Sequence, residues 1–515
     1  MYQHTYSAFL SALEGIPLEV ECYIGGGLPS LTIVGVPASA AISCRERIRG
    51  ALKNAGFTLP ASRITINIRA LDSSRQPALT ECSCLDLPIA LTILACDRQI
   101  PSQLLEHTLW LGELSLSGSL KPLFGALTIA KSAAAVSLPF TGLYLPAVNA
   151  PEAALSPALP AYPITDLFTA VEFLRHHLTL EPASPTITAS VPTFSENGFN
   201  EIRGQHLAKR VMTIAAAGRH NALLIGPPGC GKTMLSRTLP SLMPPLTFPE
   251  QLTLTEVYSC LGQLPDAGKL IANRPFRAPH HTISTPALVG GGSTPKPGEV
   301  TLAHRGVLFL DELPELSRSS LEALREPLEE HQVRITRLSR SVMFPADFLL
   351  IAGMNPCPCG FWPDKKRCRC TASALREYYR KIDSPLLDRF DLILQMEAVK
   401  PDEMDMPSGL TFDKAKALAE TARARQKNRY HSEELTNSRV AGAEIEDYCH
   451  LSESGKSLLR DAVTRYSLSM RVYHKILRTA RTIADMEDRE DVHEDHLLEA
   501  LQYRADFTEQ LALLK

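Results

Sequence analysis

One stretch of this 515-residue chain has the residue types and spacing of a phosphate-binding loop. It matches G-x-x-x-x-G-K-[ST] between an apolar stretch and a helix-forming stretch, and it consists of Gly226, Pro227, Pro228, Gly229, Cys230, Gly231, Lys232 and Thr233. In such a loop the glycines let backbone N–H groups turn inward around a β-phosphate at the positive end of a helix. Lys232 would supply a charge to the β- and γ-phosphates, and the Thr233 hydroxyl would ligate Mg²⁺. The pattern therefore predicts binding of ATP with Mg²⁺.

Two carboxylates and an amide follow the next apolar stretches. Asp311 and Glu312 end the apolar residues 307–310, and Asn355 comes soon after residues 348–352. Ligands of parallel α/β sheets bind beside the carboxyl ends of the strands, so these side chains would face the nucleotide. We predict that Asp311 holds the Mg²⁺ shell, that Glu312 orients and polarises the attacking water, and that Asn355 contacts the γ-phosphate or this water. A capping or turn role is the alternative for Asn355.

The elements that would position these residues fall into three regions around a linker. The linker is rich in Pro, Ser and Thr and shows no helical periodicity. Before it, β-branched strands and helices predict an α+β domain. After it, apolar strands alternate with helices, which predicts a parallel sheet wrapped by helices. From about residue 400 only charged amphipathic segments are found, which predicts a helical domain. The predicted strands are residues 31–35, 64–68, 222–225, 307–310 and 348–352, and the predicted helices are 45–55, 87–96, 412–425, 455–466 and 472–486. The resulting domains are 1–175, a linker at 176–200, 201–398 and 399–515.

Composition excludes several classes of protein. With 53 Lys+Arg against 56 Asp+Glu, the net charge of −3 excludes a globally basic nucleic-acid binder, although a local basic channel stays compatible with it. No apolar run approaches the ~18 residues of a membrane span, and the start of the chain has no secretory pattern. The 12 cysteines are scattered in a way that does not indicate a secreted disulfide framework. We therefore predict a cytoplasmic protein without a membrane partner.

Longer strings identify a family. The chain resembles the ComM/YifB group, in the magnesium-chelatase-like branch of AAA+ ATPases, almost end to end, through residues 27–29, 34–37, 86–91, 274–284, 290–299 and 355–360. The resemblance implies a multidomain α/β fold. Its parts are an N-terminal α+β domain of the ribosomal S5 domain 2 type shared with the Lon protease domain, an AAA+ P-loop domain with a parallel sheet, and a C-terminal helical lid.

The same resemblance implies a homo-hexameric, ATP-driven DNA motor. Such a helicase would promote branch migration of recombination intermediates during natural transformation, acting on single-stranded and branched DNA. In such rings a neighbour completes each ATP site, and Arg389 is the candidate for the arginine that acts in trans. Arg471 fits the lid arginine that reaches the nucleotide, although Arg478 and Arg481 lie close to it and a surface salt bridge is the alternative. Gln205 matches the entry segment near the adenine.

Four cysteines form two closely spaced pairs. Cys357, Cys359, Cys368 and Cys370 are near enough in sequence to hold one zinc ion through four thiolates, although one residue within each pair is tighter than the usual spacing. Zinc would hold together a Pro/Gly-rich insertion that has no hydrophobic core of its own. Reduced thiols in a loop are the alternative.

Basic residues cluster in two places that suit DNA. Between 361 and 381 basic residues outnumber acidic ones among aromatic side chains, and Lys365, Lys366 and Arg367 are our candidates for phosphate contacts. A solvated loop or a subunit contact is the alternative there. Residues 332–342 predict a hairpin of the kind that related ring helicases place in the pore, where Arg337 and Arg340 would touch the DNA backbone without reading sequence. An ordinary surface hairpin is the alternative.

Two further questions arise from the sequence. His280 and His281 would point apart in an extended strand and lack a third ligand, so we expect hydrogen-bonding or subunit-contact roles rather than a metal. In the resemblance to the Lon protease domain, Leu127 occupies the position of the catalytic lysine, so Ser83 has no base and peptidase activity is not expected. A magnesium-chelatase-type ATPase that remodels a protein partner shares the motor, and is the alternative to a DNA motor.

Overall fold

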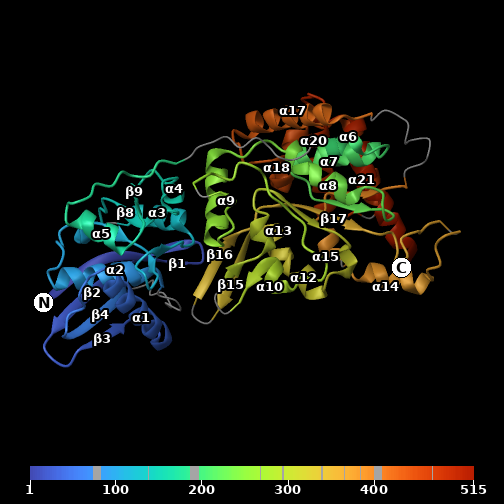
Figure 1. Ribbon diagram of the computed structural model, residues 1–515. Helices are drawn as coiled ribbons and strands as arrows, with labels where there is room; N and C mark the ends of the chain where they lie inside the picture. The colour runs from blue at the N-terminus through green and yellow to red at the C-terminus, as the bar shows by residue number, and fades with distance from the viewer. Residues whose placement is uncertain are drawn as a thin grey trace. The chain divides into compact units, whose positions relative to one another are not determined.

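The computed structural model describes residues 1–72, 83–136, 138–185, 197–266, 268–292, 295–337, 340–364, 366–382, 384–398, 409–466 and 468–514. The chain divides into two compact units (Figure 1). Unit 1 comprises Met1–Ser190 with Phe248–Ile271, and unit 2 comprises Val191–Thr247 with Ala272–Lys515. Among the described residues no helix is long and apolar enough to cross a membrane.

Unit 1 is built on a mixed seven-stranded sheet with the order β3-β4-β2-β1-β5-β8-β9. The central strands β1, β2 and β4 pair in antiparallel fashion. Strand β3 pairs with β4 in parallel, and β8 pairs in parallel with both β5 and β9. Buried and exposed residues alternate along β4, as expected of a strand with one face on a core. The strands are β1 (Tyr2–Ser11), β2 (Glu14–Gly25), β3 (Ser30–Val34), β4 (Arg63–Ala70), β5 (Leu109–Trp110), β8 (Leu143–Pro146) and β9 (Ala161–Ile164), with a separate ribbon of β6 (Glu113–Leu114) and β7 (Leu120–Lys121).

The helices of unit 1 bury the two faces of this sheet. Every residue of α2 is buried, because its sequence is almost wholly apolar and it packs on β1, β2 and α1. The helices are α1 (Ala38–Asn54), α2 (Asp86–Cys96), α3 (Ala126–Ala134), α4 (Ala150–Ala153), α5 (Leu167–Leu174) and α9 (Phe248–Cys260). The predicted α+β character of this region is confirmed.

Helix α9 is distant in sequence from the rest of unit 1. It contacts α3, where Lys131 Nζ lies 2.7 Å from Glu256 Oε1 and the backbone N–H of Gly125 donates to the Ser259 carbonyl at 3.2 Å. The Ser259 hydroxyl also donates to the buried carboxylate of Glu152. The segment Phe248–Ile271 therefore packs with unit 1, although it lies inside the range 201–398 predicted for the ATPase domain.

Unit 2 contains a five-stranded parallel sheet with the order β11-β14-β17-β10-β18. Strands β10, β14 and β17 are buried along their whole length, which agrees with the continuous apolar runs of parallel strands covered on both faces. The strands are β10 (Ala222–Ile225), β11 (Phe276–Arg277), β14 (Val307–Leu310), β17 (Leu349–Met354) and β18 (Leu392–Gln395). Two ribbons lie outside the sheet, β12 (Gly290–Gly291) with β13 (Lys296–Pro297), and β15 (Gln332–Arg337) with β16 (Arg340–Pro345).

One continuous core joins this sheet to the C-terminal helices. Helix α7 contacts α8, α17 and α20, and α20 packs on α18 and α21, so these helices gather together in Figure 1. The helices before β18 are α6 (Asn197–Glu201), α7 (His206–Gly218), α8 (Lys232–Leu242), α10 (Thr285–Val289), α11 (Glu299–Leu302), α12 (Arg318–Ala323), α13 (Arg325–Glu330), α14 (Ala372–Arg380) and α15 (Ser384–Leu387). Those after it are α17 (Phe412–Tyr430), α18 (Gly442–Cys449), α19 (Glu453–Tyr466), α20 (Met470–Met486) and α21 (Glu494–Leu514).

Candidate nucleotide site

The phosphate-loop pattern joins β10 to α8 as predicted. Gly229 and Gly231 have φ values of 80° and 94°, a left-handed conformation that glycine adopts without steric cost. Gly231 is the residue before the helix and Lys232 begins it. The loop therefore ends at a helix N-terminus, whose backbone N–H groups and partial positive charge suit a phosphate.

Lys232 connects the loop to the neighbouring strand. Its side chain is buried, and its Nζ donates to the carbonyls of Gly226 at 2.7 Å and Pro227 at 3.1 Å. The same Nζ lies 3.5 Å from Oδ1 of Asn355, which follows β17. Because β17 is hydrogen-bonded to β10, the ends of these strands are neighbours, and the predicted lysine and amide lie at one edge of the sheet.

Thr233 and Asp311 form the oxygen-rich side of this edge. The Thr233 hydroxyl donates to Asp311 Oδ2 at 3.1 Å. Gly353 leaves room for the carboxylate, because a Cβ at that position would lie 2.8 Å from Asp311 Oδ1. A hydroxyl and a carboxylate are the hard oxygen ligands that Mg²⁺ takes beside a phosphate, so these residues fit the predicted ion.

Glu312 makes a contact that the sequence did not predict. Its backbone is left-handed, with φ 50°, and its Oε2 lies 2.8 Å from Nδ1 of His281. This is the distance of an ion pair, which forms only if the imidazole is protonated, so the hydrogen-bonding role predicted for this histidine stays a prediction. The rings of His280 and His281 do not point apart, however: their centroids are 4.1 Å apart, because strand β11 ends at Arg277 and His281 lies in a turn.

Gln205 lies just before α7. Its backbone is also left-handed, with φ 50°, and its side-chain amide donates to the carbonyl of Glu397 at 2.7 Å. Glu397 follows β18, which pairs with β10. This contact holds the segment before α7 against the segment after β18.

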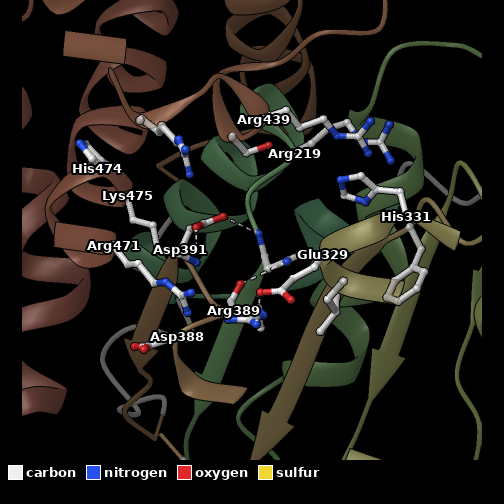
Figure 2. A pocket seen from close by; sticks show the side chains of 16 residues that line it. Arg219, Glu329, His331, Asp388, Arg389, Asp391, Arg439, Arg471, His474 and Lys475 are labelled. Atoms are coloured by element: carbon white, nitrogen blue, oxygen red, sulfur yellow. Dashed lines mark hydrogen bonds and ion pairs between the residues drawn. The ribbon is translucent and has the colours of Figure 1, made fainter. Parts of the chain in front are cut away.

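Arg389 and Arg471 line a second polar site, a cavity of about 420 Å³ (Figure 2). Of the described residues that line it, none belongs to the loop 226–233. Arg389 is paired with Glu329, whereas Arg471 is exposed and, among the described residues, its side chain has neither a hydrogen-bond nor an ion-pair partner. Within the part of the chain that the structure describes, no intrachain salt bridge therefore explains Arg471.

The two nearby arginines are now distinguished from Arg471. Arg481 is fully buried and donates to the carbonyls of Arg489 and Glu490, which is a structural role within the helical region. Arg478 lines the same cavity as Arg471, and burial lowers its pKa from the ordinary value.

Buried charges hold the wall of this cavity. Asp391 lies 2.7 Å from Lys475 Nζ, and its Oδ2 accepts from the backbone N–H of Asn221 at 3.2 Å. Burial alone would raise the pKa of Asp391, but Lys475 and His220 outweigh it and hold that pKa well below its usual range. The carboxylate is therefore ionised at neutral pH and ties α20 to the segment before β18, which carries Arg389.

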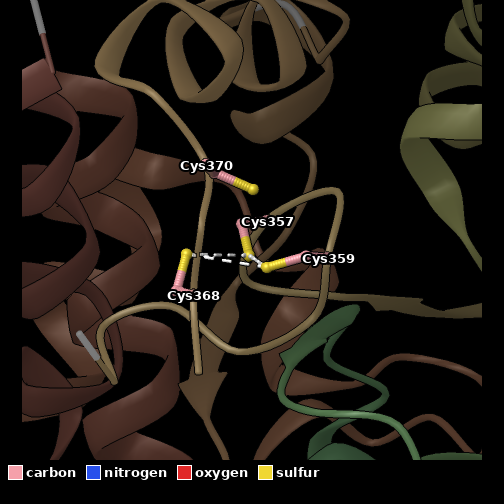
Figure 3. Close-up of side chains that lie close together, drawn as sticks. All are labelled: Cys357, Cys359, Cys368 and Cys370. Carbon is pink, nitrogen blue, oxygen red and sulfur yellow. Dashed lines mark hydrogen bonds between the residues drawn. The ribbon is translucent and has the colours of Figure 1, made fainter. Parts of the chain in front are cut away.

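The four cysteines come together as predicted (Figure 3). Their sulfurs all lie within 4.8 Å of one another. The separations are 3.3 Å for Cys357–Cys359, 3.8 Å for Cys357–Cys368 and 3.6 Å for Cys359–Cys368, and all four thiols are free. Tetrahedral zinc with Zn–S bonds of about 2.3 Å places its sulfurs about 3.8 Å apart, so the cluster has the dimensions of a four-thiolate site.

The predicted DNA contacts are described in part. The hairpin exists as β15 and β16, with Arg337 paired to Arg340 at its end, but the side chains of both arginines lie outside the described residues. Lys365 also lies outside them. Lys366 and Arg367 are exposed, and the Arg367 guanidinium lies 4.0 Å from the centre of the Phe361 ring.

The sites expected for a peptidase dyad are arranged differently. Leu127 is buried in α3, and its backbone N–H donates to Glu152 Oε1 at 3.1 Å. The Ser83 hydroxyl contacts the carboxylate of Glu113, which is paired with Lys121 at 2.8 Å. Ser83 and Lys121 thus contact the same carboxylate, and the expectation that the protein has no peptidase activity stays a prediction.

Comparison with known proteins agrees with this geometry. Family profiles match subunit ChlI of magnesium chelatase at residues 20–149 and 198–404, and its C-terminal part at 413–504. YifB of Salmonella typhimurium is 37% identical over 508 residues, 98% of this chain and 96% of its own. Competence protein ComM of Haemophilus influenzae is 36% identical over 503 residues, 97% of each chain, and Lon protease 2 of Bacillus subtilis is 28% identical over 202 residues, 35% of this chain and 36% of its own.

The fold of unit 2 and the cluster at its sheet edge define a P-loop nucleotide-binding protein. Because near-full-length relatives and three matching profiles agree, the chain belongs to the ComM/YifB family of magnesium-chelatase-like AAA+ proteins.

Proposed function

We propose that this protein is an ATP-driven DNA motor. The observation that carries the proposal is the meeting of Lys232, Thr233, Asp311 and Asn355 at one sheet edge, linked by contacts of 3.1 to 3.5 Å. Lys232 and the loop bind the phosphates, Thr233 and Asp311 hold Mg²⁺, and Asn355 contacts the γ-phosphate. Glu312 orients the water that attacks it.

Unit 2 supports a ring in which neighbours share each ATP site. Arg389 and Arg471 line one cavity, and no described residue of the phosphate loop lines it. We therefore assign both arginines to the triphosphate of an adjacent copy, where a cation supplied in trans stabilises the transition state. From the family resemblance we propose that this assembly is a homo-hexamer.

The DNA substrate is proposed from family and chemistry together. One relative is named a competence protein. The family resemblance implies action on recombination intermediates during natural transformation. Branch migration of such intermediates is the activity we propose, in the cytoplasm. The hairpin β15–β16 offers Arg337 and Arg340, and the basic loop offers Lys365, Lys366 and Arg367, for phosphate contacts that do not depend on sequence. Unit 1, with a proposed S5 domain 2-like fold, serves DNA entry or ring assembly rather than proteolysis.

The proposed cofactors are ATP and Mg²⁺, and a structural Zn²⁺ at Cys357, Cys359, Cys368 and Cys370. Zinc fits because the four sulfurs have the spacing of a tetrahedral thiolate site.

The experiment that tests the motor measures ATP hydrolysis and strand displacement with forked and four-way DNA. We expect branched DNA to stimulate hydrolysis, and DNA with non-hydrolysable nucleotide to favour a sixfold assembly. Glu312→Gln should bind ATP without turning it over, and is the control for displacement driven by hydrolysis. A protein that stays monomeric, does not hydrolyse ATP and does not respond to DNA would contradict the proposal.

Remodelling of a protein partner is the second candidate. It is favoured by the matching profiles, which describe a magnesium chelatase subunit. Hydrolysis that is insensitive to every DNA form, in a protein that still binds ATP, would favour this function over the DNA motor.

A further inference from the structure

The cysteine cluster lies directly against the phosphate loop. Gly360 follows the first cysteine pair and has φ 82°, and a Cβ at that position would lie 2.8 Å from Cδ of Pro228. The backbone of the cysteine loop therefore packs on the nucleotide loop without room for a side chain between them. This packing joins two segments that are more than a hundred residues apart in sequence.

The same cysteine loop begins at the predicted γ-phosphate contact. Asn355 is two residues before Cys357, which is fully buried. On the other side, α14 begins just after Cys370 and returns to this point: the Tyr378 hydroxyl donates to the Asn355 carbonyl at 3.2 Å, and the Tyr379 hydroxyl donates to the Pro356 carbonyl at 2.9 Å. A metal at the four sulfurs would close the loop between β17 and α14.

We infer that a zinc ion bound by these four thiolates positions the nucleotide site. The ion holds the two ends of the loop together, and the loop in turn fixes Pro228 through Gly360 and Asn355 through the backbone. Such a segment has little core of its own, so metal binding provides the order that packing does not. The inference rests on the proposed function only in taking the loop 226–233 as the ATP site.

The test uses the full chain, purified under reducing conditions. Zinc per chain is measured by elemental analysis, and affinity for a fluorescent ATP analogue is measured by titration. We expect about one zinc per chain in the parent and in the control Cys84→Ser, whose thiol lies outside the cluster. We expect Cys368→Ser to lose the metal and to bind the analogue about tenfold more weakly, the effect of one lost hydrogen bond to a charged group.

A second measurement covers the case in which Cys368→Ser fails to fold. Zinc is removed from the parent with a zinc-selective chelator in excess Mg²⁺ and then restored, and affinity should fall and recover with it. A parent without zinc would overturn the site. Zinc that can be removed without changing the affinity would overturn its role at the nucleotide loop. Failure of ATP binding in zinc-loaded protein would instead overturn the proposed function while leaving the metal site in place.

Discussion

The two polar sites of unit 2 are organised differently. At the phosphate-loop edge, the groups that we propose to bind phosphate and metal contact one another across the ends of β10, β14 and β17. In the cavity, arginines from the segment before β18 and from α20 lie beside acids, and Arg471 has no partner among the described residues. The groups of the first site contact one another within one chain, whereas the second site offers a cation that an anion from outside would satisfy.

This difference explains why one site could be recognised from local spacing and the other could not. A loop followed by a helix gathers its own backbone N–H groups, so its function is contained in consecutive residues. The cavity collects side chains from segments far apart in sequence, and its function depends on what meets it. Each of the following predictions tests one side of this contrast.

The largest effect is expected from Lys232→Ala. Removing the charge that faces the phosphates should lower ATP turnover by roughly 10³-fold or more, because electrostatic stabilisation dominates phosphoryl transfer. Phosphate release at steady state measures this. Lys427→Ala, which removes an exposed lysine paired with Glu433, should leave turnover unchanged. If Lys232→Ala still hydrolyses ATP at the parent rate, the loop is not needed for hydrolysis. The proposed difference between the phosphate-loop site and the cavity would then be wrong.

Arg389→Ala tests whether the cavity serves another copy. We expect turnover to fall by roughly 10³-fold, the lower end of the range for an arginine acting in trans. Mixing Arg389→Ala with Lys232→Ala should restore part of the activity, because each variant supplies the group that the other lacks. If mixtures stay as inactive as their components while the parent is active, the arginine acts within its own chain or not at all.

Asp391→Asn tests the buried charge that holds the cavity wall. Leaving Lys475 without its buried partner should destabilise unit 2 by roughly 3–5 kcal/mol at pH 7. The pKa of Asp391 is held below its ordinary value of 3.8, so the stability that its charge provides is present above that pH and is lost as the pH falls below it. Urea unfolding followed at neutral and acidic pH should show the difference between parent and variant shrinking on acidification.

Asp388→Asn is the matched control for that measurement. Asp388 is three residues away, its side chain is 31% exposed, and it lies 3.4 Å from Arg504. A partly solvated pair contributes less than a buried one, so the loss should be smaller. Equal losses in the two variants would show that burial does not distinguish these charges.

Much of the fold followed from the sequence where elements are long and regular. The predicted strand 222–225 matches β10, and predicted helix 472–486 lies within α20. Strands β1 and β2 were not predicted, and α9 was assigned to the ATPase region, because which sheet or helix an amphipathic segment packs on is not a local property. Predictions for Arg337, Arg340 and Lys365 concern side chains outside the described residues and stay predictions.

What the sequence determined by itself was local chemistry: the phosphate loop, the acids that end β14, and the paired cysteines. Spacing suffices there because backbone geometry over a few residues fixes where neighbouring groups point. Only the tertiary structure decided that His281 meets Glu312, that Gly360 packs on Pro228, and that Arg389 and Arg471 share a cavity. These contacts depend on strand order and close packing, because the residues that form them are far apart in sequence.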